Sequence, residues 1–95
     1  MVYYVYILES IKNSKYYIGQ TEDLEKRLER HNERSNRSTK ASAPWKVKWW
    51  KEFETRSEAV KEEMKLKKIK KRQGIDKYVI ENNFRGVAHT GPVPQ

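Results

Sequence analysis

The fold of this chain is decided by residues 3–31, which read YYVYILESIKNSKYYIGQTEDLEKRLERH. In residues 2–8 both alternating sets of side chains are aliphatic or aromatic, which predicts a central strand that is buried on both faces. The sequence KNSK at residues 12–15 is typical of a turn, and residues 15–20 return as a second β-rich segment. We therefore expect the chain to begin with a β-hairpin.

A helix should follow this hairpin. Thr21 is its expected N-cap, and two leucines four residues apart mark a buried stripe that continues to about Asn32. Arg27 and His31 are also four residues apart, so they project from one face of the same helix. Residues 33–44 are polar and predict a long loop, a type of segment that is often functional or disordered.

Residues 45–53 alternate again and predict a third strand with one face in the core. Strict alternation places Val47, Trp49, Lys51 and Phe53 on one side of this strand. It places Trp50 on the other side.

The second half of the chain should be helical. Residues 55–58 match a capping box, which predicts a helix that begins at Arg56. Gly74 suits the end of a helix, and residues 75–83 predict a short third helix. The apolar arc of the first of these helices contains Ala59, Val60, Met64, Leu66 and Ile69.

These elements predict one α+β domain over residues 1–84, with a small three-stranded, mainly antiparallel sheet and about three packed helices. Residues 85–95 contain two prolines and two glycines, so we expect a loosely ordered C-terminal tail.

The composition limits the possible functions. The chain has no cysteine, which excludes disulfides and thiolate metal sites. Its 21 Lys+Arg against 13 Asp+Glu give a net charge of +8, which favours a polyanionic partner, nucleic acid first, over a merely soluble basic surface. No apolar run approaches a membrane span and no signal-peptide pattern is present, so we expect a soluble cytoplasmic protein.

Glu63 is the most unusual residue of the chain. It lies near the middle of the apolar arc of its helix, where an unpaired carboxylate would be costly. It must therefore pair, bind a cation or lie at a cleft. Lys67, four residues on, allows the simple alternative of a surface ion pair.

Other polar residues allow both a structural and a chemical interpretation. A tyrosine on a strand, such as Tyr6 or Tyr17, ordinarily packs. Arg27 could bind phosphate oxygens through two parallel hydrogen bonds, or could form a surface ion pair with a neighbouring glutamate. His31 could hydrogen-bond a tyrosine hydroxyl or transfer a proton, or could stabilise the end of its helix.

A run of cations follows Glu63. We call it the lysine-rich ridge; it consists of Lys65, Lys67, Lys68, Lys70, Lys71 and Arg72. Such a ridge would contact DNA phosphates with little base discrimination, and the alternative is a solvated helix face. The loop residues Arg34, Arg37 and Lys40 could extend it. Trp49 or Trp50 could stack on bases, although a core role is expected for at least one of them.

Residues 2–82 resemble the GIY-YIG nuclease family, in its small stand-alone, UPF0213-like branch. The second family triplet is intact as Tyr17-Ile18-Gly19, and the first appears as Tyr4-Val5-Tyr6, with Tyr4 where glycine is common. The matching positions that follow are Gln20-Thr21, Asp23-Leu24, Arg27-Leu28, His31-Asn32, Pro44-Trp45, Ser57-Glu58-Ala59, Glu63 and Lys67.

The resemblance implies an endonuclease that hydrolyses DNA phosphodiester bonds, in DNA repair or at branched structures. It implies that Glu63 is the ligand of Mg²⁺ or Mn²⁺ and that Tyr6 and Tyr17 position or deprotonate the attacking water. A single carboxylate is workable because Mg²⁺ keeps several waters and takes oxygens from the substrate phosphate. Arg27 and His31 complete the implied catalytic set. A protein partner could supply specificity.

Two other functions are consistent with the sequence. The first is a nucleic-acid-binding module that keeps the fold and lacks turnover; Tyr4 in the first triplet and Gln20, where many members have lysine, favour it. The second is a small adaptor for an acidic protein, which would show no salt-dependent retention on DNA.

Overall fold

The computed structural model describes residues 2–33, 39–69 and 71–84. Three strands form one antiparallel sheet in the order β2-β1-β3, with β1 at Tyr3–Ser10, β2 at Tyr16–Thr21 and β3 at Trp45–Phe53. This arrangement and the helices described next confirm the expected α+β class.

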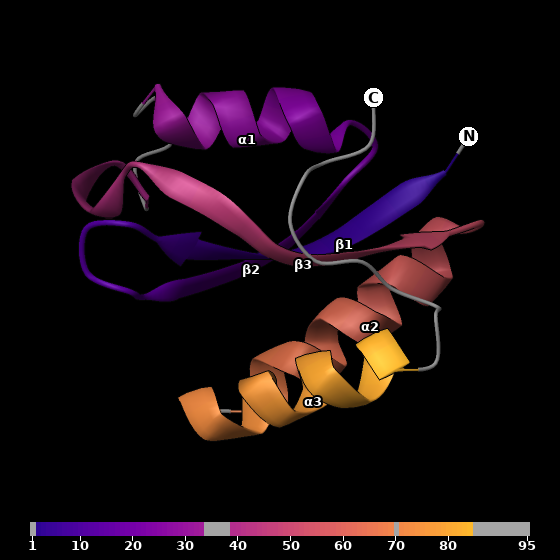
Figure 1. Ribbon diagram of the computed structural model, residues 1–95. Helices are drawn as coiled ribbons and strands as arrows, with labels where there is room; N and C mark the ends of the chain where they lie inside the picture. Colours follow the sequence, from indigo (N-terminus) through magenta and orange to yellow (C-terminus); the bar gives the residue numbers. More distant parts are fainter. Residues whose placement is uncertain (1, 34–38, 70, 85–95) are drawn as a thin grey trace.

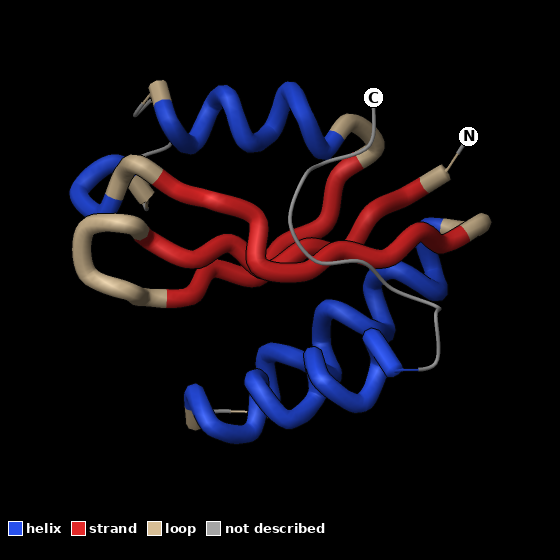
Figure 2. Tube along the Cα trace, viewed as in Figure 1, coloured by secondary structure: helices blue, strands red, loops and turns tan. Residues whose placement is uncertain are grey.

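The helices cover both faces of the sheet (Figure 1). Helix α1, Leu24–Asn32, lies on one face, and helices α2, Arg56–Lys68, and α3, Arg72–Phe84, lie on the other. A short 3₁₀ turn, Lys40–Ser42, leads into β3. The tube in Figure 2 shows the resulting layers, with the three strands between α1 and the α2–α3 pair.

Strand β1 is central and buried on both faces, as its sequence predicts. Val5 and Ile7 face α2 and α3 and pack in one core cluster with Trp49. Tyr6 and Leu8 face α1 and belong to a second cluster. The sheet therefore separates two small cores, and the aromatic residue Tyr6 belongs to the one beneath α1.

Strand β3 departs from the strict alternation predicted for it. Its register against β1 shifts between Ile7, which pairs with Trp49, and Leu8, which pairs with Val47. This bulge adds one residue to β3 and reverses the orientation of the residues before it. Val47 therefore packs with Trp50 under α1, and the prediction that it shares a face with Trp49 was wrong.

Of the two helix caps predicted from the sequence, one is confirmed and the other is wrong. Thr55 caps α2 by accepting a hydrogen bond from the Glu58 backbone N–H, so the start at Arg56 is confirmed. Helix α1 is capped by Asp23, which accepts from the Lys26 N–H, and the prediction of Thr21 was wrong. Both residue types are good caps, and sequence alone does not set the register between them.

Two expectations for α2 and α3 also need correction. Helix α2 ends at Lys68 with Ile69 as its C-cap, and Gly74 lies inside the first turn of α3. A Cβ atom on Gly74 would lie 2.5 Å from Cγ2 of Ile69, so this glycine allows the two helices to pack closely. Met64, expected on the buried arc, is 54% exposed, since Ala59 and Leu66 alone fill the buried face of α2.

Within the described part of the chain, no helix is long and apolar enough to cross a membrane. The tail predicted to be loosely ordered, residues 85–95, lies outside the described residues.

Candidate active site

The site is built around Tyr6, which crosses the backbone of Gly19. The two residues are paired between β1 and β2, and β2 is an edge strand of the sheet. A Cβ atom at position 19 would lie 2.6 Å from Oη and 2.8 Å from Cζ of Tyr6. The missing side chain of Gly19 therefore provides the space that the phenol occupies.

His31 reaches the same hydroxyl from α1. Its Nε2 lies 3.3 Å from Oη of Tyr6, and its Nδ1 lies 2.8 Å from Oγ1 of Thr39, in the segment before β3. The ring of Tyr17 packs on the imidazole with centroids 4.8 Å apart. His31 and Thr39 are both buried, so this is a preorganised polar chain inside the domain.

Burial and neighbouring charges set the protonation states of these groups. Burial raises the pKa of Tyr6 above its ordinary value of 10; the nearby Tyr17 and the carboxylate of Glu63 raise it further. The guanidinium of Arg27 acts in the opposite direction, by its charge and by hydrogen bonding. Burial, with a smaller contribution from Arg27, lowers the pKa of His31 below 6.5. Phenol and imidazole are therefore both uncharged near neutral pH.

Glu63 lies on α2, in the helical layer on the other side of the sheet from His31. Its charge nevertheless acts on the Tyr6 hydroxyl. Its side chain is 16% exposed and its Oε2 accepts an ion pair from Nζ of Lys67 at 2.8 Å. The carboxylate is therefore mostly buried, and its partner Lys67 is 56% exposed, so the lysine can leave the ion pair without a change in the core.

Four of the five residues expected at the site thus contact the fifth, Tyr6, or act on its hydroxyl by their charge. Tyr17 and His31 contact one another beside it, and Arg27 and Glu63 come close enough to change its pKa. Arg27 belongs to α1 and Glu63 to α2, so residues from both faces of the sheet act on one hydroxyl beside the edge strand β2.

A metal ion at this site would have one protein carboxylate. Among the described residues, no group of three or more His, Asp or Glu side chains could hold a metal ion. Glu63 fits Mg²⁺ or Mn²⁺ as a single ligand because its carboxylate keeps some exposure, 16%, and the partner of its Oε2 is an exposed lysine that a cation can displace. The remaining oxygens would come from water and from the substrate.

The lysine-rich ridge is only partly available. Lys65, Lys68 and Lys71 are exposed, although Lys65 lies over the ring of Tyr78 at 5.8 Å, and Lys67 pairs with Glu63. Of the loop cations, Lys40 is exposed at the start of the 3₁₀ turn. Three of the residues expected to bind nucleic acid lie outside the described residues: Arg34, Arg37 and Lys70.

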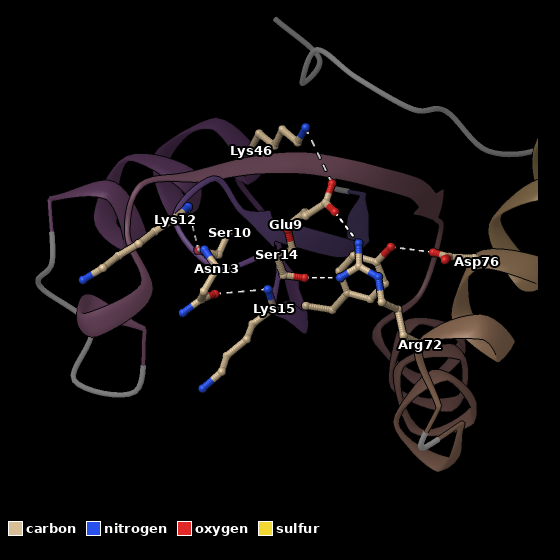
Figure 3. A network of polar contacts seen from close by, with 10 residues as sticks. Glu9, Ser10, Lys12, Asn13, Ser14, Lys15, Lys46, Arg72 and Asp76 are labelled. Atoms are coloured by element: carbon tan, nitrogen blue, oxygen red, sulfur yellow. Dashed lines mark hydrogen bonds and ion pairs between the residues drawn. The ribbon is translucent and has the colours of Figure 1, made fainter.

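Arg72, the last member of the ridge, joins α3 to the β1–β2 hairpin (Figure 3). Its guanidinium donates to the Ser14 carbonyl and to Oε2 of Glu9, the latter at 2.6 Å, and stacks on the ring of Tyr16 at 4.2 Å. Tyr16 donates a hydrogen bond to Oδ1 of Asp76 at 2.5 Å. Burial and, to a smaller extent, this hydrogen bond raise the pKa of Tyr16 to about 12. This network holds the first turn of α3 against the sheet.

Trp49 and Trp50 are both buried, so neither ring is available to stack on a base. Thr39, the partner of His31, was not predicted as a site residue. A threonine in a polar loop carries no periodic signal, so only the fold reveals this contact.

Comparison with known proteins identifies the family of the chain. The family described as the GIY-YIG catalytic domain matches residues 2–78. The chain belongs to the GIY-YIG family, a family of nucleases. The matched region includes every residue that converges on Tyr6.

Similar proteins come from several bacteria. A UPF0213 protein of Listeria welshimeri is 41% identical over 80 residues, which cover 83% of this chain and 87% of the relative. A UPF0213 protein of Bacillus licheniformis is 34% identical over 86 residues, with 90% and 87% covered. One of Streptococcus pneumoniae is 35% identical over 85 residues, with 88% and 84% covered. No solved structure gives a significant match to the chain.

Proposed function

We propose that this GIY-YIG domain is a divalent-metal-dependent endonuclease that hydrolyses phosphodiester bonds in DNA. The observation that carries the proposal is the contact of the His31 imidazole with the hydroxyl of Tyr6, supported by the opposing charges of Arg27 and Glu63 that act on the same hydroxyl. A base, an anion-binding cation and a metal ligand are the three functions that hydrolysis of a phosphodiester needs.

We assign the direction of the hydrogen bonds from Tyr6 to Thr39 from the charge of Arg27. Its guanidinium acts on the Tyr6 hydroxyl and carries only N–H donors, so it favours the orientation in which the phenol oxygen faces Arg27 and the phenol proton is directed to another acceptor. His31 Nε2, 3.3 Å away, is the acceptor in reach. Neutral His31 then carries its own proton on Nδ1 and donates it to Oγ1 of Thr39 at 2.8 Å.

This arrangement makes Tyr6 and His31 a proton relay. As a water oxygen attacks phosphorus, the water gives a proton to the Tyr6 oxygen while the Tyr6 proton passes to Nε2 of His31. The new P–O bond forms, the P–O bond to the leaving oxygen breaks, and that oxygen takes a proton from solvent. Because the phenol never becomes a free phenolate, the raised pKa of Tyr6 is compatible with a base role. Tyr17, which packs on His31, would position the water.

Arg27 and Glu63 act on the phosphate in this proposal. The guanidinium of Arg27 binds non-bridging oxygens, where charge increases in the transition state. Glu63 would hold Mg²⁺ or Mn²⁺; when bound, the ion supplies Lewis-acid polarisation of the phosphate and offsets the effect of Glu63 on the Tyr6 pKa. Lys67 would exchange its ion pair with Glu63 for a contact to DNA.

The net charge of +8 supports DNA as the partner, with exposed Lys68 and Lys71 of the lysine-rich ridge as backbone contacts. We propose a role in the repair of DNA or in the processing of branched DNA in the cytoplasm, with specificity supplied by a protein partner.

One observation favours a second candidate, a DNA-binding module without useful turnover. The phenol of Tyr6 is only 1% exposed and its pKa is raised, so little of it is open to an attacking water. In that case the same cations would bind DNA and the divalent ion would have no effect.

A nicking assay on supercoiled plasmid and on branched DNA separates the two candidates. The nuclease predicts nicks that need Mg²⁺ or Mn²⁺ and disappear with EDTA. An Arg27→Gln variant should nick at least about 100-fold more slowly. Salt-dependent retention on DNA without nicking under any divalent ion would support the binding module, and the absence of both would leave the adaptor function.

A further inference from the structure

A groove of about 470 Å³ is lined in part by Arg27 and by no other residue of the Tyr6 site. It lies where β2 ends and where α1 and α2 begin. These three element ends lie on the right-hand side of Figure 1. Its volume is within the range of sites that bind a nucleotide-sized ligand, about 300–1,000 Å³. Its charged lining residues are four cations and two carboxylates: Lys26, Arg27, Arg30, Arg56, Glu22 and Asp23.

Two of these cations occupy positions that are unfavourable for helix stability. Lys26 is in the first turn of α1, and Arg56 is the first residue of α2. The helix dipole favours anions at these ends and disfavours cations by about 0.3–1 kcal/mol each. Helix formation therefore does not explain either cation, whereas an anionic ligand in the groove would explain both.

The two carboxylates do not close the groove to an anion. Asp23 is occupied as the N-cap of α1. Glu22 pairs with Arg56 at 3.7 Å, but both side chains are well exposed, 43% and 70%, so this ion pair is weak and easily exchanged. Arg56 also lies over the ring of Tyr3 at 5.7 Å, which holds its guanidinium above the groove.

Arg27 connects the groove to the active site. It lines the groove, and it also acts on the hydroxyl of Tyr6. If Arg27 holds one DNA phosphate beside Tyr6, the next phosphates of that DNA strand lie either in the groove or away from it. The groove is the favoured position for these phosphates, because its four cations outnumber its two carboxylates.

We propose that this groove holds the sugar–phosphate backbone of DNA next to the phosphate that is cleaved, with Lys26, Arg30 and Arg56 as phosphate contacts. The inference rests on the proposed function and adds a direction to it: the bound strand runs from Tyr6 past Arg27 to the start of α2.

The test measures the binding of a fluorescent DNA duplex without divalent ions, so that it does not depend on cleavage. The groove variant combines Lys26→Gln, Arg30→Gln and Arg56→Gln and leaves Arg27 and Glu63 in place. A charge-matched control combines Lys12→Gln, Lys15→Gln and Lys77→Gln, three exposed lysines that do not line the groove. Thermal unfolding checks that both variants are folded.

Each phosphate contact contributes about 0.9 to the slope of log K against log salt concentration. We expect the groove variant to lose about 2–3 units of this slope and to bind at least about 10-fold more weakly, with the control close to wild type. A groove variant that is folded and keeps the slope and affinity of the control would overturn the inference.

The outcome is separable from that of the nuclease proposal. If the groove variant loses salt slope but the wild-type protein never nicks DNA, the nuclease proposal is refuted and the groove remains a DNA-binding site. If the wild-type protein nicks DNA with a divalent ion but the groove variant binds DNA normally, the groove proposal is refuted and the nuclease proposal remains.

Discussion

The hydroxyl of Tyr6 lies over the backbone of Gly19, in the space where any larger residue would place its Cβ atom, 2.6 Å from Oη. Glycine at this position thus decides where the phenol can lie. The consequence is that the absence of a side chain at one position of the edge strand β2 controls the position of the hydroxyl at the centre of the site.

Gly19→Ala should displace Tyr6 from His31. The displaced ring must enter a packed cluster, which costs about 1–3 kcal/mol of stability. We expect nicking to be lost as well, measured on supercoiled plasmid after the unfolded fraction is determined by urea titration. Gly74→Ala is the matched control, because its Cβ would contact Ile69 between α2 and α3 and destabilise the protein without moving Tyr6. Equal nicking by the two variants would contradict the role of Gly19.

Thr39 should position His31 rather than merely fill space. Thr39→Val removes the acceptor of the Nδ1–H bond at almost constant volume and leaves a buried donor unpaired, a cost of about 1–3 kcal/mol. We expect kcat to fall by about 10-fold or more with little change in KM, and Thr39→Ser to restore it.

The tautomer of His31 can be observed directly. The ¹⁵N NMR signals of the imidazole should show a proton on Nδ1 in the wild type and in Thr39→Ser, and a mixture of tautomers in Thr39→Val. A wild-type spectrum with the proton on Nε2 would be incompatible with the relay.

The pKa of His31 predicts a pH dependence of stability. The pKa of His31 is below 6.5 in the folded state. As the pH falls through 6.5, His31 therefore takes up a proton in the unfolded chain but not yet in the folded chain. The free energy of unfolding should therefore decrease below pH 6.5, down to the folded pKa of His31, and this group should add no dependence above that window. Urea unfolding at about pH 7.5 and about pH 5.5 should show a larger decrease in wild type than in His31→Gln. Identical decreases would show that His31 is not the titrating group.

The exposed part of the lysine-rich ridge should contribute to DNA binding independently of the groove. Replacing Lys65, Lys68 and Lys71 with glutamine should reduce the salt slope of duplex binding by about 2–3. The variant with Lys12, Lys15 and Lys77 replaced again serves as the control. An unchanged slope would show that DNA binds elsewhere.

The sequence predicted the sheet well because the patterns of its strands are strong. The run of apolar residues in β1 is possible only in a central strand, and the capping box at Thr55 sets the start of α2. It could not predict the bulge in β3, because a one-residue insertion follows from pairing with β1 and not from the residues of β3.

The site was predictable only in part. Gly19 carried a visible signal, since a glycine late in a strand suggests close approach of another group. The partnership of His31 with Thr39 joins a helix to a loop that has no periodic pattern, and the convergence of Arg27 and Glu63 depends on how helices from opposite faces approach β2. Such contacts follow from tertiary packing, which local patterns do not encode.

The central claim is that Glu63 is the carboxylate through which a divalent ion serves the Tyr6 site. Its most direct test is Glu63→Ala beside Glu62→Ala, the neighbouring glutamate on the same helix, assayed with Mg²⁺ or Mn²⁺ on supercoiled DNA. We predict that Glu63→Ala loses about 100-fold or more of the nicking rate and still binds the DNA duplex, while Glu62→Ala keeps both. Nicking by Glu63→Ala at the rate of Glu62→Ala would contradict the account.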